Sequence, residues 1–369
     1  MRRFVILSVT MLLALTGCTH RGATSIRAAR FDYNRAIVDT RNEQMLANLV
    51  RLYYRDSPYF LEVSSIATQY AYTGNVSASV NSISTSGTTI GGLGAGVAYE
   101  ERPTVTYLPL KGDDFVTRML APIPWETIVL LNHSGWRVDR LLRCGVQRMN
   151  DLRNAPTASG PTPDRAPEFE GFVEMSTALN RLFRNGAAEV RFHPIGSSSS
   201  DEAPMEDRFE ITMVFENRED AAADLETVKR LLGLSKDLNE FRLTGNPTYR
   251  RSNEIGILPR SLLGVMSYLS QTVEPLQRDI DAGRVTITRT PEGEVFDWDE
   301  LTGGLFEIQS SLEQPHNAFV QVRYRDAWFY IDDADLTSKS TFTLIGQLFE
   351  LQAGDAGGVA PLLTLPIGN

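Results

Sequence analysis

Residues 70–99 carry no charged side chain, and apolar and small polar residues alternate along most of this stretch. A side-chain period of two is typical of a β-strand with two different faces. The apolar positions are even-numbered in the first half and odd-numbered in the second half: Tyr70, Tyr72, Val76, Ala78 and Val80, then Leu93, Ala95, Val97 and Tyr99. Ser86-Gly87 separates the halves, so the pattern predicts a β-hairpin within residues 59–110.

A two-residue loop at Ser86-Gly87 would also fix the register of this hairpin. It places Val76 opposite Val97 and Val80 opposite Leu93. Every apolar residue of one arm then faces an apolar residue of the other arm, which is the register we expect.

The predicted hairpin has the dimensions of a membrane strand pair. Each arm has about eleven alternating residues, the length of a tilted strand that crosses an outer membrane. Tyr70, Tyr72 and Tyr99 gather at one end, as an interfacial aromatic girdle does. Because open strand edges in lipid leave backbone groups unpaired, insertion requires hairpins from several protomers. Two alternatives are pairing with the sheet edge of a partner protein and a flexible insertion.

The N-terminal residues have the three-part layout of a secretory signal. Arg2 and Arg3 precede an apolar run over residues 4–15 that is too short to span a bilayer. The ending Leu15-Thr16-Gly17-Cys18 resembles the lipobox of bacterial lipoproteins. This resemblance implies removal of residues 1–17 as a signal peptide, followed by acylation of Cys18 through a diacylglyceryl thioether and an amide-linked chain such as palmitate.

The expected location follows from the same resemblance. Several acyl chains make a stable anchor where one chain does not. Thr19 stands where inner-membrane retention usually has Asp, so the resemblance implies an outer-membrane protein that faces the periplasm. In addition, residues 43–66, EQMLANLVRLYYRDSPYFLEVSSI, resemble a group of uncharacterised Gram-negative outer-membrane lipoproteins, a similarity that implies no activity.

Composition excludes one class of partner and one class of cross-link. Loss of the signal would remove Arg2 and Arg3 but no acidic residue, so the mature chain is more acidic than the formal net charge of −10 of the whole sequence. An acidic chain is a poor match for nucleic acid. Cys144 is the only cysteine besides Cys18, and acylation of Cys18 would therefore leave no pair for an intramolecular disulfide.

The patterning predicts an α+β fold in two modules. A lipidated tether (18–30) leads into a helical module (31–154) that carries the β-hairpin. The Pro- and Ser-rich segment APTASGPTPDRAP (155–167) reads as a linker, and residues 168–369 form a mixed α+β module. Helices are expected at 45–53, 114–121, 125–131, 138–152, 168–184, 219–232, 260–268 and 340–351. Strands are expected at 208–215, 241–244, 285–288, 305–310, 319–324 and 327–331.

Catalytic motifs are lacking in the sequence, so we expect a protein that is not an enzyme and needs no cofactor. Asp332, Asp333 and Asp335 are weak candidates for a metal site, and the favoured alternative is a helix start. The expected function is an oligomeric outer-membrane lipoprotein whose hairpin contributes to a shared membrane barrel or export or assembly channel. The alternatives are a monomeric periplasmic scaffold that docks on an envelope complex through the hairpin, and an unrecognised periplasmic hydrolase.

Overall fold

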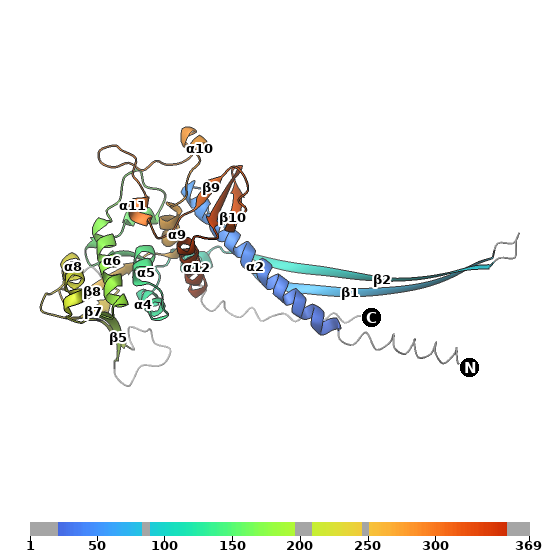
Figure 1. The fold of residues 1–369 in the computed structure, drawn as a ribbon, viewed down its shortest axis with the longest axis horizontal. Helices are drawn as coiled ribbons and strands as arrows, with labels where there is room; N and C mark the ends of the chain where they lie inside the picture. Colours follow the sequence, from blue (N-terminus) through green and yellow to red (C-terminus); the bar gives the residue numbers. More distant parts are fainter. Residues whose placement is uncertain (1–20, 83–88, 196–208, 246–250, 353–369) are drawn as a thin grey trace. The chain divides into compact units, whose positions relative to one another are not determined.

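The computed structural model describes residues 21–82, 89–195, 209–245 and 251–352. Within these ranges the chain forms two compact units. One unit comprises residues 21–58 and 111–352 and is called the body below. The other is the β-hairpin, residues 59–110. The fold is α+β, as the patterning predicts (Figure 1).

A six-stranded sheet forms one layer of the body, with strand order β4-β3-β8-β7-β6-β5. The strands are β3 (Val146–Met149), β4 (Leu152–Arg153), β5 (Ala188–Pro194), β6 (Phe209–Phe215), β7 (Glu240–Thr244) and β8 (Glu254–Pro259). Neighbours are antiparallel except β7 and β8, which are parallel. Ile211, Met213 and Phe215 alternate along β6 and are buried, which is the pattern of a strand with one face on the core.

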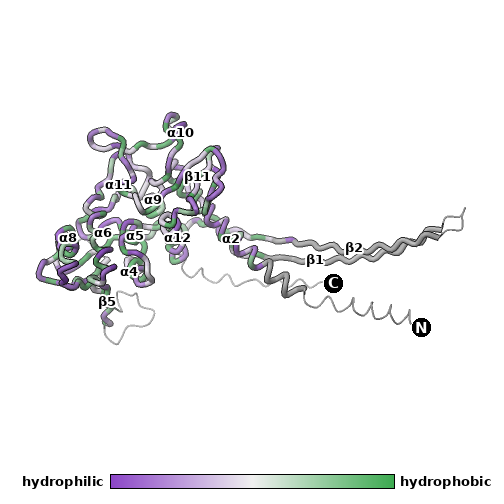
Figure 2. Tube along the Cα trace, viewed as in Figure 1, coloured by the Kyte–Doolittle hydropathy of each residue, from purple (hydrophilic) through white to green (hydrophobic). Residues whose placement is uncertain are grey.

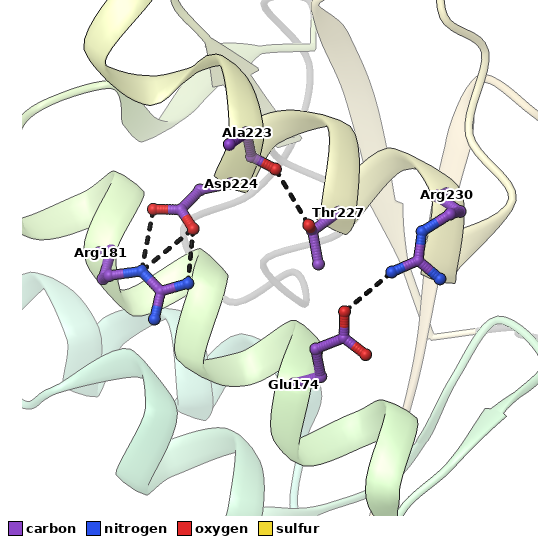
Figure 3. A network of polar contacts seen from close by, with 6 residues as sticks. All are labelled: Glu174, Arg181, Ala223, Asp224, Thr227 and Arg230. Atoms are coloured by element: carbon purple, nitrogen blue, oxygen red, sulfur yellow. Dashed lines mark hydrogen bonds and ion pairs between the residues drawn. The ribbon is translucent and has the colours of Figure 1, made fainter.

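Helices α6 (Glu170–Arg184) and α8 (Ala222–Leu232) pack against each other. In α6, Phe172, Met175, Leu179 and Leu182 recur at helical spacing and are fully buried. Two ion pairs join the exposed rims of the helices (Figure 3): Arg181 donates to Asp224 at 2.5 Å, and Arg230 donates to Glu174 at 2.8 Å.

Helix α9 (Leu262–Ser270) is an apolar and almost wholly buried segment of the body, which Figure 2 colours mainly as hydrophobic. The Ser261 hydroxyl caps its first turn by accepting from the Gly264 N–H. The elements in contact with it are α2 (Arg21–Tyr53), the π-helix η2 (Val116–Leu120), α5 (Val138–Gly145), η3 (Pro156–Ser159) and α12 (Leu336–Leu351). The other helices of the body are α3 (Asp113–Phe115), α4 (Trp125–His133), η4 (Glu219–Ala221), α10 (Gln277–Asp281) and α11 (Asp299–Thr302).

A three-stranded sheet completes the body, in the order β10-β11-β9. Its strands are β9 (Gln309–Ser311), β10 (Ala318–Tyr324) and β11 (Ala327–Asp332). Arg325 and Asp326, with φ of 47° and 61°, form the two-residue loop between β10 and β11. Two consecutive left-handed residues are what a type I′ turn requires, so the hairpin predicted around Arg325-Asp326 is confirmed.

Several predicted elements differ from the structure. The helix predicted over 138–152 ends at Gly145, and the chain continues as β3 and β4. Residues 285–288 form no strand, and the strand predicted at 305–310 is reduced to β9. Helix α2 already begins at Arg21, so the described part of the predicted tether is helical.

The predicted linker at 155–167 is wrong. Ala155 and Ala158 are fully buried, Thr162 is almost so, and residues before and after this segment share one sheet. The Arg260 side chain, 1% exposed, explains this packing. Its guanidinium donates to the carbonyls of Arg143 (3.1 Å), Cys144 (3.2 Å), Val146 (2.6 Å), Asn154 and Ala155 (3.5 Å), and to the Ser159 hydroxyl (2.8 Å).

The same contacts explain why α5 stops at Gly145. The last carbonyls of a helix have no partner within the helix. Here Arg260 takes those of Arg143 and Cys144, and the Asn154 amide donates to Leu142 and Arg143. Burial lowers the pKa of Arg260 to about 10, so this guanidinium remains charged at neutral pH.

We expect Arg260→Met to lower the free energy of unfolding by about 3–5 kcal/mol, because it leaves buried carbonyls unpaired. Arg153→Met is the matched control: its side chain is 57% exposed and pairs with Glu168 at 3.5 Å. The control should cost about 0–1 kcal/mol. Urea unfolding followed by circular dichroism measures both, and equal losses would contradict the role given to Arg260.

Candidate functional site

The hairpin consists of β1 (Leu61–Ser82, 22 residues) and β2 (Thr89–Pro109, 21 residues), the two long strands of Figure 1. The strands are antiparallel and paired along their whole described length. One register shift, between Val63 and Ser65, interrupts the ladder near its start. An extra residue of this kind increases the local twist of a strand pair.

The predicted register is wrong by two residues. Val76 pairs with Ala95, not with Val97, and Val97 pairs with Gly74. Likewise Ala78 pairs with Leu93 and Val80 with Gly91. In these four pairs a Val or Leu lies opposite a Gly or Ala, whereas Tyr72 lies opposite Tyr99. The predicted turn, Ser86-Gly87, lies outside the described residues.

A shift of two residues leaves the two faces of the hairpin unchanged, because the side-chain period of a strand is also two. The predicted site positions therefore still share one face of the strand pair. Tyr72 lies opposite Tyr99, and Tyr70 lies opposite Glu101. The other face has Thr73, Asn75, Ser77 and Ser79 in β1, opposite Ala98, Gly96, Gly94 and Gly92 in β2.

Charge is distributed unevenly along the ladder. The eleven pairs from Tyr72–Tyr99 to Ser82–Thr89 contain no charged residue. The next three pairs contain Glu100, Glu101 and Arg102. The ladder thus changes from uncharged pairs to pairs with charged residues immediately beside the Tyr72–Tyr99 pair. Farther from the turn, Val105, Tyr107 and Leu108 of β2 are exposed apolar side chains.

The body fixes the residues that precede the hairpin. Helix α2 ends in a Schellman motif: Asp56 N–H donates to the Arg51 carbonyl (2.8 Å) and Arg55 N–H donates to Leu52 (3.1 Å). Arg55 has a φ of 60°, a conformation in which glycine is usual, and its guanidinium donates to the Thr162 carbonyl at 2.8 Å. The chain then reaches Tyr59, the first residue of the hairpin, within three residues of Asp56.

Asp56 belongs to a cluster of aromatic and charged side chains within the body. Its carboxylate accepts hydrogen bonds from the Tyr324 hydroxyl and from Arg325 (2.9 Å). The Arg325 guanidinium also lies over the Tyr54 ring, 4.8 Å from its centroid. The hydrogen bond from Tyr324 and then that from Arg325 lower the pKa of Asp56 more than burial raises it.

Asp279 extends this cluster into α10. It is fully buried and accepts from the Tyr54 hydroxyl and from Arg284, both at 2.9 Å. Burial raises the pKa of Asp279, but the hydrogen bonds from Arg284 and Tyr54 and the nearby arginine charges outweigh burial, so the net pKa is lowered. The cluster of Tyr54, Asp56, Asp279, Arg284, Tyr324 and Arg325 therefore ties the end of α2 to α10 and to the β10–β11 turn; we call it the anchor cluster.

The three aspartates considered for a metal have other partners. Asp335 caps α12 by accepting from the N–H groups of Thr337 and Ser338, each at 3.0 Å. Asp333 pairs with Lys339 at 2.6 Å, and Asp332 accepts from the Ala334 N–H at 2.7 Å. The helix-start interpretation is confirmed for Asp335. Among the described residues, no group of three or more His, Cys, Asp or Glu side chains could hold a metal ion.

The predicted lipidation residue, Cys18, lies outside the described residues. None of the helices in the described part of the chain is both long and apolar enough to cross a membrane. The sequence matches no protein-family model, no curated protein and no solved structure. Functional assignment therefore depends on the chemistry of the residues themselves.

The anchor cluster was not predicted from the sequence. Its members Asp56 and Tyr324 are separated by 268 positions, and neither belongs to a recognisable motif. The signals that were available are the Asp56-Ser57-Pro58 helix stop and the Arg325-Asp326 turn. Both are local signals, and nothing in either indicates that the two turns meet.

We expect stability to fall as pH drops below about 4, because the pKa of Asp56 and that of Asp279 are lower in the folded chain than the ordinary value near 3.9. Their contribution is present above the unfolded pKa and is lost as pH falls through the folded pKa. Asp279→Asn should lower the free energy of unfolding at pH 7 by about 1.5–3 kcal/mol and flatten this acid dependence.

Asp326→Asn is the control, because its carboxylate is 85% exposed and it also lies in the β10–β11 turn. Urea unfolding at pH 7, 5, 4 and 3 compares the three proteins. An acid dependence as steep in Asp279→Asn as in the unmodified protein would contradict a role for this carboxylate in the anchor cluster.

Proposed function

We propose that the protein is an outer-membrane lipoprotein that acts by assembly and not by catalysis, and that several protomers contribute their hairpins to one shared membrane barrel or export channel. The observation that carries the proposal is the run of eleven uncharged residue pairs, bounded by Tyr72 and Tyr99 and then by Glu100, Glu101 and Arg102.

The length of this run supports membrane insertion. At about 3.3 Å per residue, eleven residues extend about 36 Å along a strand. Tilted by about 45°, such a strand spans roughly 25 Å, which is the height of the apolar band of an outer-membrane barrel. The tyrosines stand at one end of the run, where aromatic residues of such barrels meet the head groups.

The distribution of residue types between the two faces supports a barrel wall. Val76, Val80, Leu93 and Val97 occupy the face that would meet lipid. Serine, threonine, asparagine and glycine predominate on the face that would line a lumen, together with Ala98 and Ile90. The lipid-directed face also has Gly74 and Gly91, so it is less apolar than that of a typical barrel strand. A lone hairpin has two unpaired edges, which lipid does not tolerate, and this requires neighbouring protomers.

The lipid anchor is the first part to test. Cys18→Ser should abolish acylation. We expect the hairpins to assemble in the membrane only after the lipid has anchored the protomers, so the variant should also be lost from the membrane fraction of cells. Incorporation of a radioactive fatty acid, followed by fractionation, measures both effects. Labelling that persists in the variant would contradict the lipobox assignment.

One set of observations favours the alternative, a monomeric periplasmic scaffold that docks on an envelope complex. The strands are about twice as long as a membrane requires, and Val105, Tyr107 and Leu108 are exposed beyond the uncharged run. Exposed apolar side chains on a strand edge are suited to pairing with the sheet of a partner protein. In the barrel proposal the same residues belong to contacts between protomers outside the membrane.

Four arginine variants distinguish these functions. Arg at Val76 or Val97 should cost about 2–4 kcal/mol per site near the membrane midplane, and the cost repeats in every protomer of a ring. We expect these two variants to lose oligomer. The matched controls are Ser77→Arg and Gly96→Arg, each one position away from a test site and on the lumen-directed face. These two variants should still form the oligomer but should alter its conductance.

The measurements are the mass of the detergent-extracted protein and single-channel current in planar bilayers. Equal tolerance at all four positions would contradict the barrel. A defect at Val76 and Val97 without any current in the unmodified protein would favour the docking scaffold, as would a monomeric mass.

A further inference from the structure

We propose that neighbouring hairpins pair head to tail, with the outer edge of β2 in one protomer against the outer edge of β1 in the next, and that Pro103 ends this pairing. The inference rests on the proposed shared barrel, because it names the strand edges that join the protomers and the residue at which their pairing stops. The observations that carry it are the directions of the backbone N–H groups and the positions of the prolines along β2.

One hydrogen bond at the base of the hairpin sets the direction of the N–H groups along β2. The Leu110 N–H donates to the Phe60 carbonyl at 3.0 Å, so it points toward the other arm. Along an antiparallel strand, residues that bond to the partner strand alternate with residues that point away from it. The one register shift leaves this alternation intact in β2, because its extra residue, Ser64, belongs to β1. Odd-numbered residues of β2 therefore direct their backbone groups to the outer edge.

Both prolines of β2, Pro103 and Pro109, occupy such outward positions. Proline has no N–H, so at these positions it removes no hydrogen bond from the hairpin itself. It does remove a donor from the outer edge, and prolines on edge strands are one device that prevents pairing with a further strand. The outer edge of β2 is therefore blocked from Pro103 to Pro109. Beyond Pro103, contacts between protomers involve side chains such as Val105 and Tyr107 and no shared ladder.

The rest of the outer edge of β2 is suited to pairing. Each outward position before Pro103 has an N–H group: Thr89, Gly91, Leu93, Ala95, Val97, Tyr99 and Glu101. β1 has no proline between Leu61 and Ser82, so its outer edge is not blocked.

The unblocked part of β2 contains the whole uncharged run and ends at the charged residues Glu100, Glu101 and Arg102. Within a membrane every backbone group needs a partner from protein, whereas outside it water can supply one. An edge that pairs with a neighbour along the uncharged run and is blocked just after the charged residues meets both conditions. Pro103 thus stands where pairing between protomers is no longer needed.

The direction of insertion selects head-to-tail pairing. Under the proposed function every protomer is anchored on the periplasmic side, so all hairpins enter the membrane in the same direction. Two β2 strands or two β1 strands from neighbours would then be parallel. β2 beside the β1 of the next protomer continues the antiparallel order of the hairpin, which is the order in outer-membrane barrels. A head-to-tail contact that repeats in this way can close into a ring.

Proline substitutions at two outward positions test the boundary. Ala95→Pro removes an N–H from the unblocked edge, and Val105→Pro, the matched control, removes one from the blocked edge. Neither N–H donates within the hairpin, so the hairpin itself should form in both variants, and circular dichroism checks this. We expect Ala95→Pro to lower the oligomeric fraction of the detergent-extracted protein at least about tenfold, because the lost pairing recurs in every protomer. Val105→Pro should retain the oligomer.

The other outcomes separate this pairing from the shared barrel. An oligomer in Ala95→Pro as abundant as in the unmodified protein would overturn the proposed edge and leave the barrel standing. Loss of the oligomer in Val105→Pro as well would overturn Pro103 as the end of the pairing. A monomeric unmodified protein would overturn both the barrel and the pairing.

A mixing experiment tests the head-to-tail order. Ala78 pairs with Leu93, an outward residue, so Ala78→Pro blocks the outer edge of β1. Ala95→Pro leaves that edge free but blocks β2. We expect the two variants, with different affinity tags, to co-purify as a dimer when mixed in detergent, although neither associates with itself. Self-association of Ala78→Pro would indicate pairing between two β2 strands and would overturn the head-to-tail order.

Amide hydrogen exchange measures how far the pairing extends. The oligomer of the unmodified protein is compared with the Ala95→Pro monomer, in which the same amides lack a neighbouring strand. We expect additional protection in the oligomer over residues 89–101 and none over residues 104–108. Additional protection that continues through residues 104–108 would overturn the role proposed for Pro103.

Discussion

Arg260 brings five backbone carbonyls and one hydroxyl around a single buried cation, and the middle of the body is organised by these contacts. The partners are dipoles and the Tyr268 ring, 4.2 Å from the guanidinium carbon. Two of the carbonyls belong to the C-terminal turn of α5, where the helix dipole places partial negative charge. The same cation therefore ends α5, starts β3 and holds the segment after β4 in the core.

How much of this the sequence predicts depends on the range of each interaction. Helices with a long apolar period, such as α6, and turns with local chemistry, such as Arg325-Asp326, are predictable because their causes lie within a few residues. The segment 155–167 has the composition of a linker, but Arg260 sets its packing. Arg260 lies more than one hundred positions after Ser159, the residue of this segment whose hydroxyl it binds. Composition carries no information about such a partner.

The candidate site also has features that local sequence patterns predict and features that they do not. The hairpin and its two faces are predictable from a period of two, and they survive an error of two residues in register because the error is a whole period. The alternation alone does not fix the register, because registers that differ by two residues place the same positions on the same faces. The anchor cluster depends on contacts between distant segments, so no local pattern predicts it.

The end of α2 combines a local helix-ending motif with contacts between distant segments. A chain that needed only to leave the helix would use glycine after the last turn, since glycine adopts a positive φ without strain. Here Arg55 adopts it, its guanidinium reaches Thr162, and the next residue, Asp56, is held by Tyr324 and Arg325. Side-chain contacts on two consecutive residues fix the direction in which the chain leaves α2. The anchor cluster and the Arg55–Thr162 hydrogen bond thus fix the backbone of the body at Arg55 and Asp56.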